Sequence, residues 1–250
     1  MKQRYFIELM YDGSRFHGWQ IQPNSLTVQE RLNVAVSTVL AQDVNVVGAG
    51  RTDSGVHAKQ MFAHFDTPKT IERADFIHKL NSFLENDISV INLRKVKSDA
   101  HCRFDAISRT YEYHIFFKKN PFLHKRAWFV PYNLDIRSMT EASDCLRNYS
   151  DFTSFSKLHT QTKTNLCNII NVEWREMEDS LVFVIEANRF LRNMVRAIVG
   201  SLVDIGLSKN TIAGFCQIIE NKNRALAGVS APAHGLYLSS VKYPKTIWNE

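Results

Sequence analysis

Hydrophobic positions in the first hundred residues follow two periods in turn, and together they predict a β-α-β-β-α-β order. Four short runs with strand-like patterning lie at about Tyr5–Tyr11, Val44–Val47, Met61–Phe65 and Ile88–Val96. The two segments between them have apolar residues one turn apart: Val28, Leu32, Val36, Val39 and Leu40, then Phe76, Ile77, Leu80, Phe83 and Leu84. Thr27 and Glu30 have the form of a capping box at the start of the first helix. The pattern is that of a split βαβ unit.

The second half of the chain repeats this order. Tyr111, Tyr113 and Ile115 alternate with Thr110, Glu112 and His114 as in a half-buried strand, and a helix with Ile136, Met139, Ala142 and Leu146 follows. Next come two strands, a long helix, a short helix and a last strand: Ile169–Trp174, Leu181–Ile185, a segment with Leu191 to Leu202, one with Ile212 to Ile219, and Leu236–Leu238.

We therefore expect an α+β protein built from two pseudo-repeated, ferredoxin-like halves. The predicted halves are residues 1–105 and 106–250, and they form a largely antiparallel sheet with helices on one side. A central active-site cleft is expected between them, because small sites form in such clefts. The first half carries the loop of candidate chemistry described below, and the second is expected to complete the cleft.

Composition narrows the class of protein. The 250 residues are 44% hydrophobic and 22% charged, as in ordinary globular proteins, and no run approaches the roughly 18 apolar residues of a membrane helix. The N-terminal segment has no apolar core of a secretory signal, so we expect a cytoplasmic protein without membrane attachment. The four cysteines show no close pairing, which favours reduced thiols and gives no sign of a metal site.

The net charge of +6 is compatible with a nucleic-acid partner but does not require one. Two clusters of basic residues are more informative: Lys157, His159 and Lys163 lie in a polar stretch, and Arg189, Arg192 and Arg196 recur at helical spacing. Both clusters are candidate phosphate contacts. The alternative for the arginines is an ordinary solvated helix face.

The segment Gly48–His57 offers the clearest candidate chemistry. It places the carboxylate of Asp53 next to the guanidinium of Arg51, among glycines that allow another molecule to approach closely. The glycine pattern fits neither a dinucleotide fingerprint nor a phosphate loop, and His57 lacks the glutamate and the Cys-x-x-Cys of a zinc deaminase. A surface turn with an ion pair is the alternative interpretation.

Two further segments bear on Asp53. The stretch from Tyr11 to Gln20 mixes aromatic, amide and cationic side chains, including Arg15, and this mixture suits RNA as well as it suits a loop around one buried Trp. In Ser108–Tyr113, the alternation puts Tyr111 on the apolar side of its strand, so periodicity alone favours a core tyrosine.

These segments together resemble the tRNA pseudouridine synthase A family. The resemblance extends over nearly the whole chain. It is carried by Gly50–Ala58, Tyr11–Gly13 with His17–Gln20, Ser108–Tyr111, Asp151–Phe155, Phe190–Leu191 with Met194–Arg196 and Val199–Gly200, and Ala231–Pro232 with Gly235–Leu236. Ser54 stands where alanine is commoner, and the loop from Ser156 to Asn165 matches less well.

The resemblance implies an isomerase that converts uridine to pseudouridine in the anticodon stem-loop of tRNA, at positions 38–40, without metal or organic cofactor. It implies a homodimer in which one tRNA contacts both subunits. The position of Asp53 is that of the essential aspartate, the arginine matching Arg196 pairs with it, and the tyrosine matching Tyr111 stacks on the target base. Whether Arg51 pairs with Asp53 instead, or contacts phosphate, stays open.

The chemistry agrees with these residue types. Moving the glycosidic bond from N1 to C5 requires a nucleophile on the sugar or the base, and a carboxylate with a reference pKa of about 3.9 is ionised at neutral pH. Flipping a uridine out of a stem costs a few kcal/mol, of which an aromatic stack returns roughly 1 to 3 kcal/mol. The remaining candidate substrate contacts are Arg109, Gln20, Arg15, Lys163, Arg189 and Arg192.

Three rival hypotheses remain: a non-catalytic tRNA-binding protein of the same fold, an aspartate-dependent N-glycosidase that releases free uracil, and a purely structural loop at residues 48–57.

Overall fold

The computed structural model describes residues 2–157 and 163–248 of the chain. The chain divides into two compact units, Met1–Ile107 with Leu238–Glu250, and Ser108–Tyr237. The segment from Leu238 onward, predicted as part of the second half, belongs to the first unit. No helix among the described residues combines the length and the hydropathy that crossing a bilayer requires.

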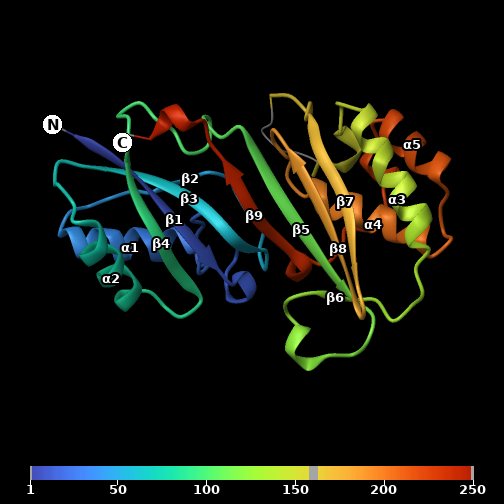
Figure 1. The fold of residues 1–250 in the computed structure, drawn as a ribbon, viewed down its shortest axis with the longest axis horizontal. Helices are drawn as coiled ribbons and strands as arrows, with labels where there is room; N and C mark the ends of the chain where they lie inside the picture. Colours follow the sequence, from blue (N-terminus) through green and yellow to red (C-terminus); the bar gives the residue numbers. More distant parts are fainter. Residues whose placement is uncertain (1, 158–162, 249–250) are drawn as a thin grey trace. The chain divides into compact units, whose positions relative to one another are not determined.

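The first unit has the predicted β-α-β-β-α-β order (Figure 1). Its elements are β1 (Gln3–Tyr11), α1 (Val28–Leu40), β2 (Val47–Gly48), β3 (His57–Thr67), α2 (Arg73–Phe83) and β4 (Ile88–Val96). β1 is the central strand and pairs antiparallel with both β3 and β4, while β2 pairs antiparallel with Ala63 and His64 of β3. The last strand, β9 (Leu236–Lys242), lies next to β3.

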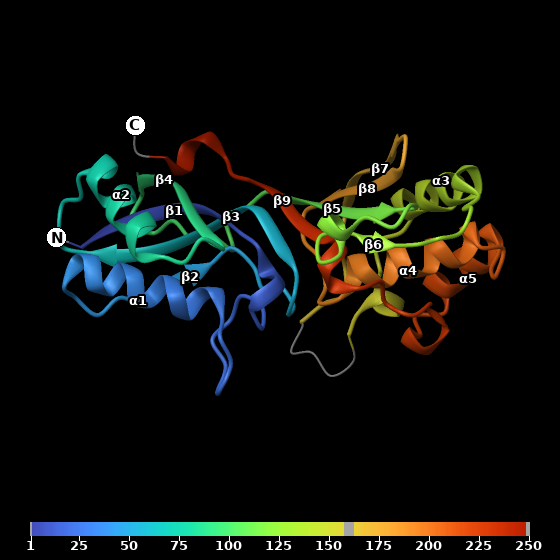
Figure 2. The same cartoon turned by 90° about the horizontal axis from the view of Figure 1, so that it is seen from below.

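The two helices of this unit lie on one face of its sheet. Phe76 of α2 stacks on Phe65 of β3, which stacks in turn on Tyr5 of β1, and α1 contacts α2. Figure 2 shows α1 running along the strands of this unit. The predicted cap is confirmed, because the Thr27 side chain accepts a hydrogen bond from the Glu30 backbone N–H at 3.4 Å.

The opposite face of the same sheet is covered by the C-terminal segment. Phe6 and Phe62 point to this side, and the rings of Tyr243 and Trp248 make edge-on or tilted contacts with both. This packing explains why residues after 238 belong to the first unit. With both faces covered, β3 is buried along most of its length and supports the loop that precedes it.

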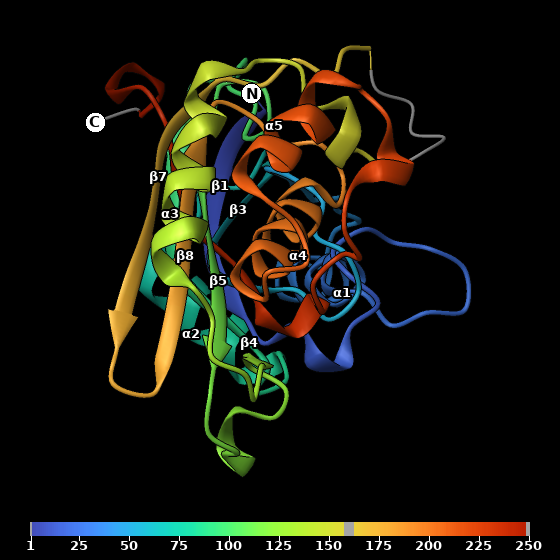
Figure 3. The same ribbon diagram turned by 90° about the vertical axis from the view of Figure 1, so that its right-hand side faces the viewer.

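The second unit repeats this order as far as its second main helix and adds one short strand and one short helix. Its elements are β5 (Ser108–Phe116), β6 (Trp128–Phe129), α3 (Ile136–Asp144), β7 (Ile169–Met177), β8 (Ser180–Ala187), α4 (Met194–Gly206) and α5 (Ile212–Glu220). β8 is the central strand and pairs antiparallel with β5 and β7, and the short β6 runs parallel to β5. The three helices contact one another (Figure 3). The mixed α+β class and the largely antiparallel pairing are as predicted.

Helix α4 is the core of the second unit. Nearly all of its residues are buried, among them Met194, Ile198 and Leu202, as the apolar spacing predicts. A side chain at Gly200 would lie 1.9 Å from the Val229 carbonyl oxygen, so the segment after α5 packs directly on the helix backbone.

Candidate functional site

The candidate carboxylate lies in the first unit, on the loop between β2 and β3. The flanks of this loop are tied to the segment that follows β1. The hydroxyls of Tyr11 and Thr52 are hydrogen-bonded at 2.9 Å, and the Trp19 backbone N–H donates to the Thr52 carbonyl oxygen at 3.2 Å. Thr52 is therefore held from two sides, and Asp53 is the next residue.

The far flank of the loop is held by Phe16. Its carbonyl oxygen accepts hydrogen bonds from the Gly55 backbone N–H at 3.2 Å and from the Ser54 hydroxyl at 3.3 Å. The Gly13 N–H donates to Nδ1 of His57, where β3 begins, at 3.1 Å. The serine that replaces the commoner alanine is thus accommodated by a hydrogen bond.

Two glycines allow this close contact. A Cβ on Gly13 would lie 2.0 Å from the Val56 carbonyl oxygen, and one on Gly18 would lie 2.5 Å from the Thr52 carbonyl oxygen. Gly18 also has a φ of +88°, which L side chains rarely adopt. The predicted RNA-contacting loop after β1 is therefore also the clamp that shapes the Asp53 loop.

Within this clamp the Asp53 side chain is partly exposed, and Arg51 and Gln20 are exposed. Arg15 is exposed as well and forms an ion pair with Asp87 at 2.8 Å. A surface pair of this kind contributes little to stability, so a phosphate can replace the carboxylate partner of Arg15 at small cost.

Tyr111 lies in the second unit, on β5 opposite Ile185 of β8. Its ring makes a T-shaped contact with the ring of Phe190, at a centroid distance of 5.0 Å and an interplanar angle of 86°. The expectation from periodicity, a core tyrosine, is wrong for Tyr111, because its side chain is only half-buried. Tyr113, two residues further on, is the fully buried one.

Arg196 is held in the first turns of α4. Its Nε donates to the Ala231 carbonyl oxygen at 2.7 Å, and the Ala231 N–H donates to the Arg196 carbonyl oxygen at 2.9 Å. The Tyr113 hydroxyl donates to the next carbonyl oxygen, that of Pro232, at 2.8 Å. Burial raises the pKa of Tyr113, although the guanidinium of Arg196 opposes the rise. Both donors fix the segment at 231–232.

The expected placement of Arg189 and Arg192 on a helix with Arg196 is wrong. Helix α4 begins only at Met194, after Asn193, whose φ of 68° lies in the left-handed region. Arg189 donates to the Thr164 carbonyl oxygen at 3.2 Å, and the carbonyl oxygen of Arg192 accepts from the Lys157 N–H at 3.0 Å. These contacts hold both edges of the stretch from Ser156 to Asn165.

The remaining predicted contacts lie near the same end of the β5–β8 pair or in the adjoining loop. Arg109 donates to the Asn188 carbonyl oxygen at 3.0 Å, and Lys163 is exposed. His159 lies outside the described residues. Phe190 and Ala231 position Tyr111 and Arg196, respectively. The motif segments include both residues, but nothing in their spacing indicates these contacts.

One group of side chains has the composition of a metal site. Donor atoms of His64, His101 and Cys102 lie within 4.8 Å of one another. His64 Nδ1 lies 3.1 Å from Cys102 Sγ, and His101 Nδ1 accepts from the backbone N–H of Arg103 at 3.1 Å. These bonds use Nδ1 of both rings, so they favour a structural role for the group. Burial lowers the pKa of His64 to about 4, with a smaller contribution from Arg4.

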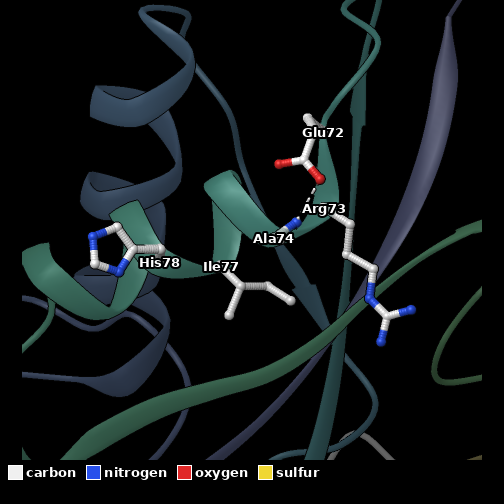
Figure 4. Close-up of a pocket in the computed structure, with 5 residues that line it drawn as sticks. All are labelled: Glu72, Arg73, Ala74, Ile77 and His78. Carbon is white, nitrogen blue, oxygen red and sulfur yellow. Dashed lines mark hydrogen bonds between the residues drawn. The ribbon is translucent and has the colours of Figure 1, made fainter.

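A pocket of about 600 Å³ lies on the exposed side of α2. Figure 4 shows its lining residues, with the Glu72 carboxylate bonded to the Ala74 N–H at the start of the helix. The polar group there serves as a helix cap, and the pocket contains none of the predicted site residues.

Comparison with known proteins bears on both units. Residues 9–105 and 149–244 match the family model described as tRNA pseudouridine synthase. The chain is 53% identical to tRNA pseudouridine synthase A of Bacteroides thetaiotaomicron over 99% of this chain and 93% of that protein. It is 52% identical to the protein of that name from Bacteroides fragilis, over 98% of each chain, and 41% identical to that of Bacillus licheniformis, over 94% of this chain and 97% of that protein.

Proposed function

Because the chain belongs to the tRNA pseudouridine synthase family, we propose that it isomerises uridine to pseudouridine in the anticodon stem-loop of tRNA, at positions 38–40. The observation that supports this best is the state of Asp53. Its loop is hydrogen-bonded on both flanks, and Asp53 itself is partly exposed. A nucleophile requires a fixed backbone and a side chain that a substrate can reach.

In the proposed reaction, the carboxylate of Asp53 attacks the flipped nucleotide, on the sugar or the base. The bond between N1 and C1′ breaks, the uracil turns, and C5 forms the new bond to C1′. The bond between Asp53 and the nucleotide also breaks, which restores the free carboxylate. The proton on C5 is lost and N1 gains one, so atoms and charge balance without an oxidant or a cofactor.

Arg196 is proposed to pair with that carboxylate and to orient it. Its bonds to Ala231 restrain the side chain and the helix turn that carries it, which lowers the entropy lost on pairing. Arg51, exposed on the same loop as Asp53, is the second candidate for this role.

Tyr111 is proposed to stack on the target base. The edge-on contact with Phe190 restrains its ring, and its half-exposed position gives a base access to it. Arg109, Arg189, Arg192, Lys163, Arg15 and Gln20 are proposed as contacts to the rest of the stem-loop. Arg189 and Arg192 lie on an irregular segment before α4, so their side chains can reach RNA phosphates in more directions than side chains on one helix face can.

We also propose a cytoplasmic homodimer in which one tRNA contacts both subunits. The support for this assembly is the similarity to the family alone, and sedimentation of the protein with and without tRNA tests it.

The function is tested by tritium release from tRNA transcripts labelled at uridine C5. Wild type is expected to release tritium and Asp53→Asn to release none, at matched folding and with tRNA binding within about twofold. Binding without release by wild type would favour the non-catalytic tRNA-binding protein, and free uracil with an abasic tRNA would favour an N-glycosidase. Full activity of Asp53→Asn would leave the loop a structural role only.

A further inference from the structure

A second feature suited to RNA lies on the loop between β5 and β6, residues 117–127. The loop reads Phe-Lys-Lys-Asn-Pro-Phe-Leu-His-Lys-Arg-Ala, with four lysines and arginines and no acidic residue. The Asn120 side chain caps its short turn at Pro121–Leu123 by accepting from the Phe122 N–H at 3.0 Å. The turn therefore has a defined shape that presents the side chain of Phe122.

Phe122 is 86% exposed, so the faces of its ring are accessible to a base. Beside it is a pocket of about 410 Å³, lined by Lys118, Lys119 and Phe122 together with Asp179. Lys118 pairs with Asp179 at 2.7 Å, which leaves the surroundings of the pocket with an excess of positive charge. The combination of an exposed ring with cations is that of single-stranded RNA-binding surfaces.

The loop lies at the opposite end of β5 from the proposed substrate contacts. Arg109 pairs with Ala187 at one end of the β5–β8 ladder, and Phe116 pairs with Ser180 at the other. Figure 1 shows this loop beyond the arrowhead of β5, beside the turn between β7 and β8. From Tyr111 to the start of the loop the strand rises by about 20 Å.

The base of the loop is fixed to the rest of the second unit. The Val130 N–H donates to the Phe116 carbonyl oxygen at 3.0 Å, and the Tyr237 hydroxyl donates to the Arg126 carbonyl oxygen at 2.7 Å. A fixed base keeps the loop at a constant distance from Tyr111, so a substrate that contacts both must span that distance.

We propose that this loop binds a second segment of the tRNA, outside the anticodon stem-loop, with an unpaired base stacked on Phe122 and a phosphate at Lys119. The proposal rests on the proposed function, because it takes tRNA as the substrate. Charge favours this partner: phosphates complement the lysines, and every base has a face that can stack on the ring. A separation of about 20 Å exceeds the size of one flipped nucleotide, so Tyr111 and Phe122 contact different nucleotides.

The test compares binding of full-length tRNA transcript and of the isolated anticodon stem-loop by fluorescence titration. Phe122→Ala is expected to raise Kd for full-length tRNA about tenfold, equivalent to about 1.4 kcal/mol, and to leave Kd for the stem-loop within about twofold. Phe122→Tyr keeps the ring and should bind as wild type does. Lys119→Gln is expected to reduce the slope of log K for tRNA against log salt concentration by the contribution of about one phosphate contact.

Lys209→Gln, at an exposed position between α4 and α5, is the matched control and should change neither value. Equal effects of Phe122→Ala on the two RNAs, or no effect on either, would overturn the proposal. Tritium release by wild type is measured on the same tRNA. Its absence would refute the proposed function, while the binding comparison would still decide the role of the loop.

Discussion

Replacing Gly18 by alanine tests whether the segment after β1 shapes the catalytic loop. Gly18 lies three residues after Arg15 and two residues before Gln20, and it has no side chain of its own to offer a substrate. Its effect therefore has to pass through the backbone of Thr52 and Asp53, which a new Cβ would meet at 2.5 Å and 3.1 Å.

The magnitude follows from two contributions. Placing alanine at a φ of +88° costs about 1 to 2 kcal/mol, and the contact with the Thr52 carbonyl oxygen requires that oxygen to move by roughly 0.5 to 1 Å. We expect the free energy of unfolding to fall by about 2 kcal/mol. Because misplacing a catalytic group by about 1 Å costs on the order of 100-fold in rate, we expect kcat to fall by about 10- to 100-fold.

The assay is tritium release under single-turnover conditions, with urea unfolding and tRNA titration on the same preparations. Kd for tRNA is expected to stay within about threefold, since the phosphate contacts are unchanged. Gly50→Ala is the control for stability within the Asp53 loop, because a Cβ there meets no protein atom within 4 Å, and its free energy of unfolding should match that of wild type. A Gly18→Ala protein that is folded and retains full kcat, or a Gly50→Ala protein that loses as much stability as Gly18→Ala, would refute the reasoning.

Two further predictions concern other parts of the chain. Tyr111→Ala should lower kcat/KM by about 10- to 100-fold through loss of stacking, whereas Tyr111→Phe should retain most activity; a large loss in Tyr111→Phe, measured by tritium release, would instead assign the hydroxyl to proton transfer. The pKa of His64 is about 4 in the folded protein and about 6.5 in the unfolded chain. Between these two pH values the unfolded chain binds a proton that the folded protein does not bind, so stability falls as the pH drops from about 6.5 towards about 4. Between about pH 7 and pH 5, the free energy of unfolding measured in urea should fall by about 2 kcal/mol more for wild type than for His64→Gln. His78→Gln, at an exposed position, is the control and should behave as wild type. Parallel pH profiles for wild type and His64→Gln would contradict this.

The fold could be predicted where local periodicity coincides with the element. β4 has the predicted bounds, Ile88–Val96, and α1 begins after its predicted cap, Thr27. β3 is longer than its apolar run, since pairing between Tyr11 and Ala58 extends the ladder through polar positions. The two-residue strand β6, Trp128–Phe129, has no period to detect, because pairing with β5 alone makes it a strand.

The site was less predictable because its geometry depends on contacts distant in sequence. The spacing of Arg189, Arg192 and Arg196 fits a helix, but the left-handed Asn193 delays the helix start, and no periodicity reveals that conformation. The alternation placed Tyr111 on the same side of β5 as Tyr113. The alternation could not show that Tyr113 is buried and Tyr111 only half-buried, because burial depends on which other segments pack against that side of the strand.

The two segments that first indicated chemistry, Tyr11–Gln20 and Gly48–His57, are one structural unit. Hydrogen bonds join the first segment to Thr52, Ser54 and Gly55 of the second, and the glycines at 13 and 18 leave room for this contact. A residue of the first segment can therefore matter for catalysis without touching RNA, by fixing the Asp53 backbone. Variants in this segment separate the two roles: loss of rate at unchanged tRNA affinity identifies the clamp, and loss of affinity identifies an RNA contact.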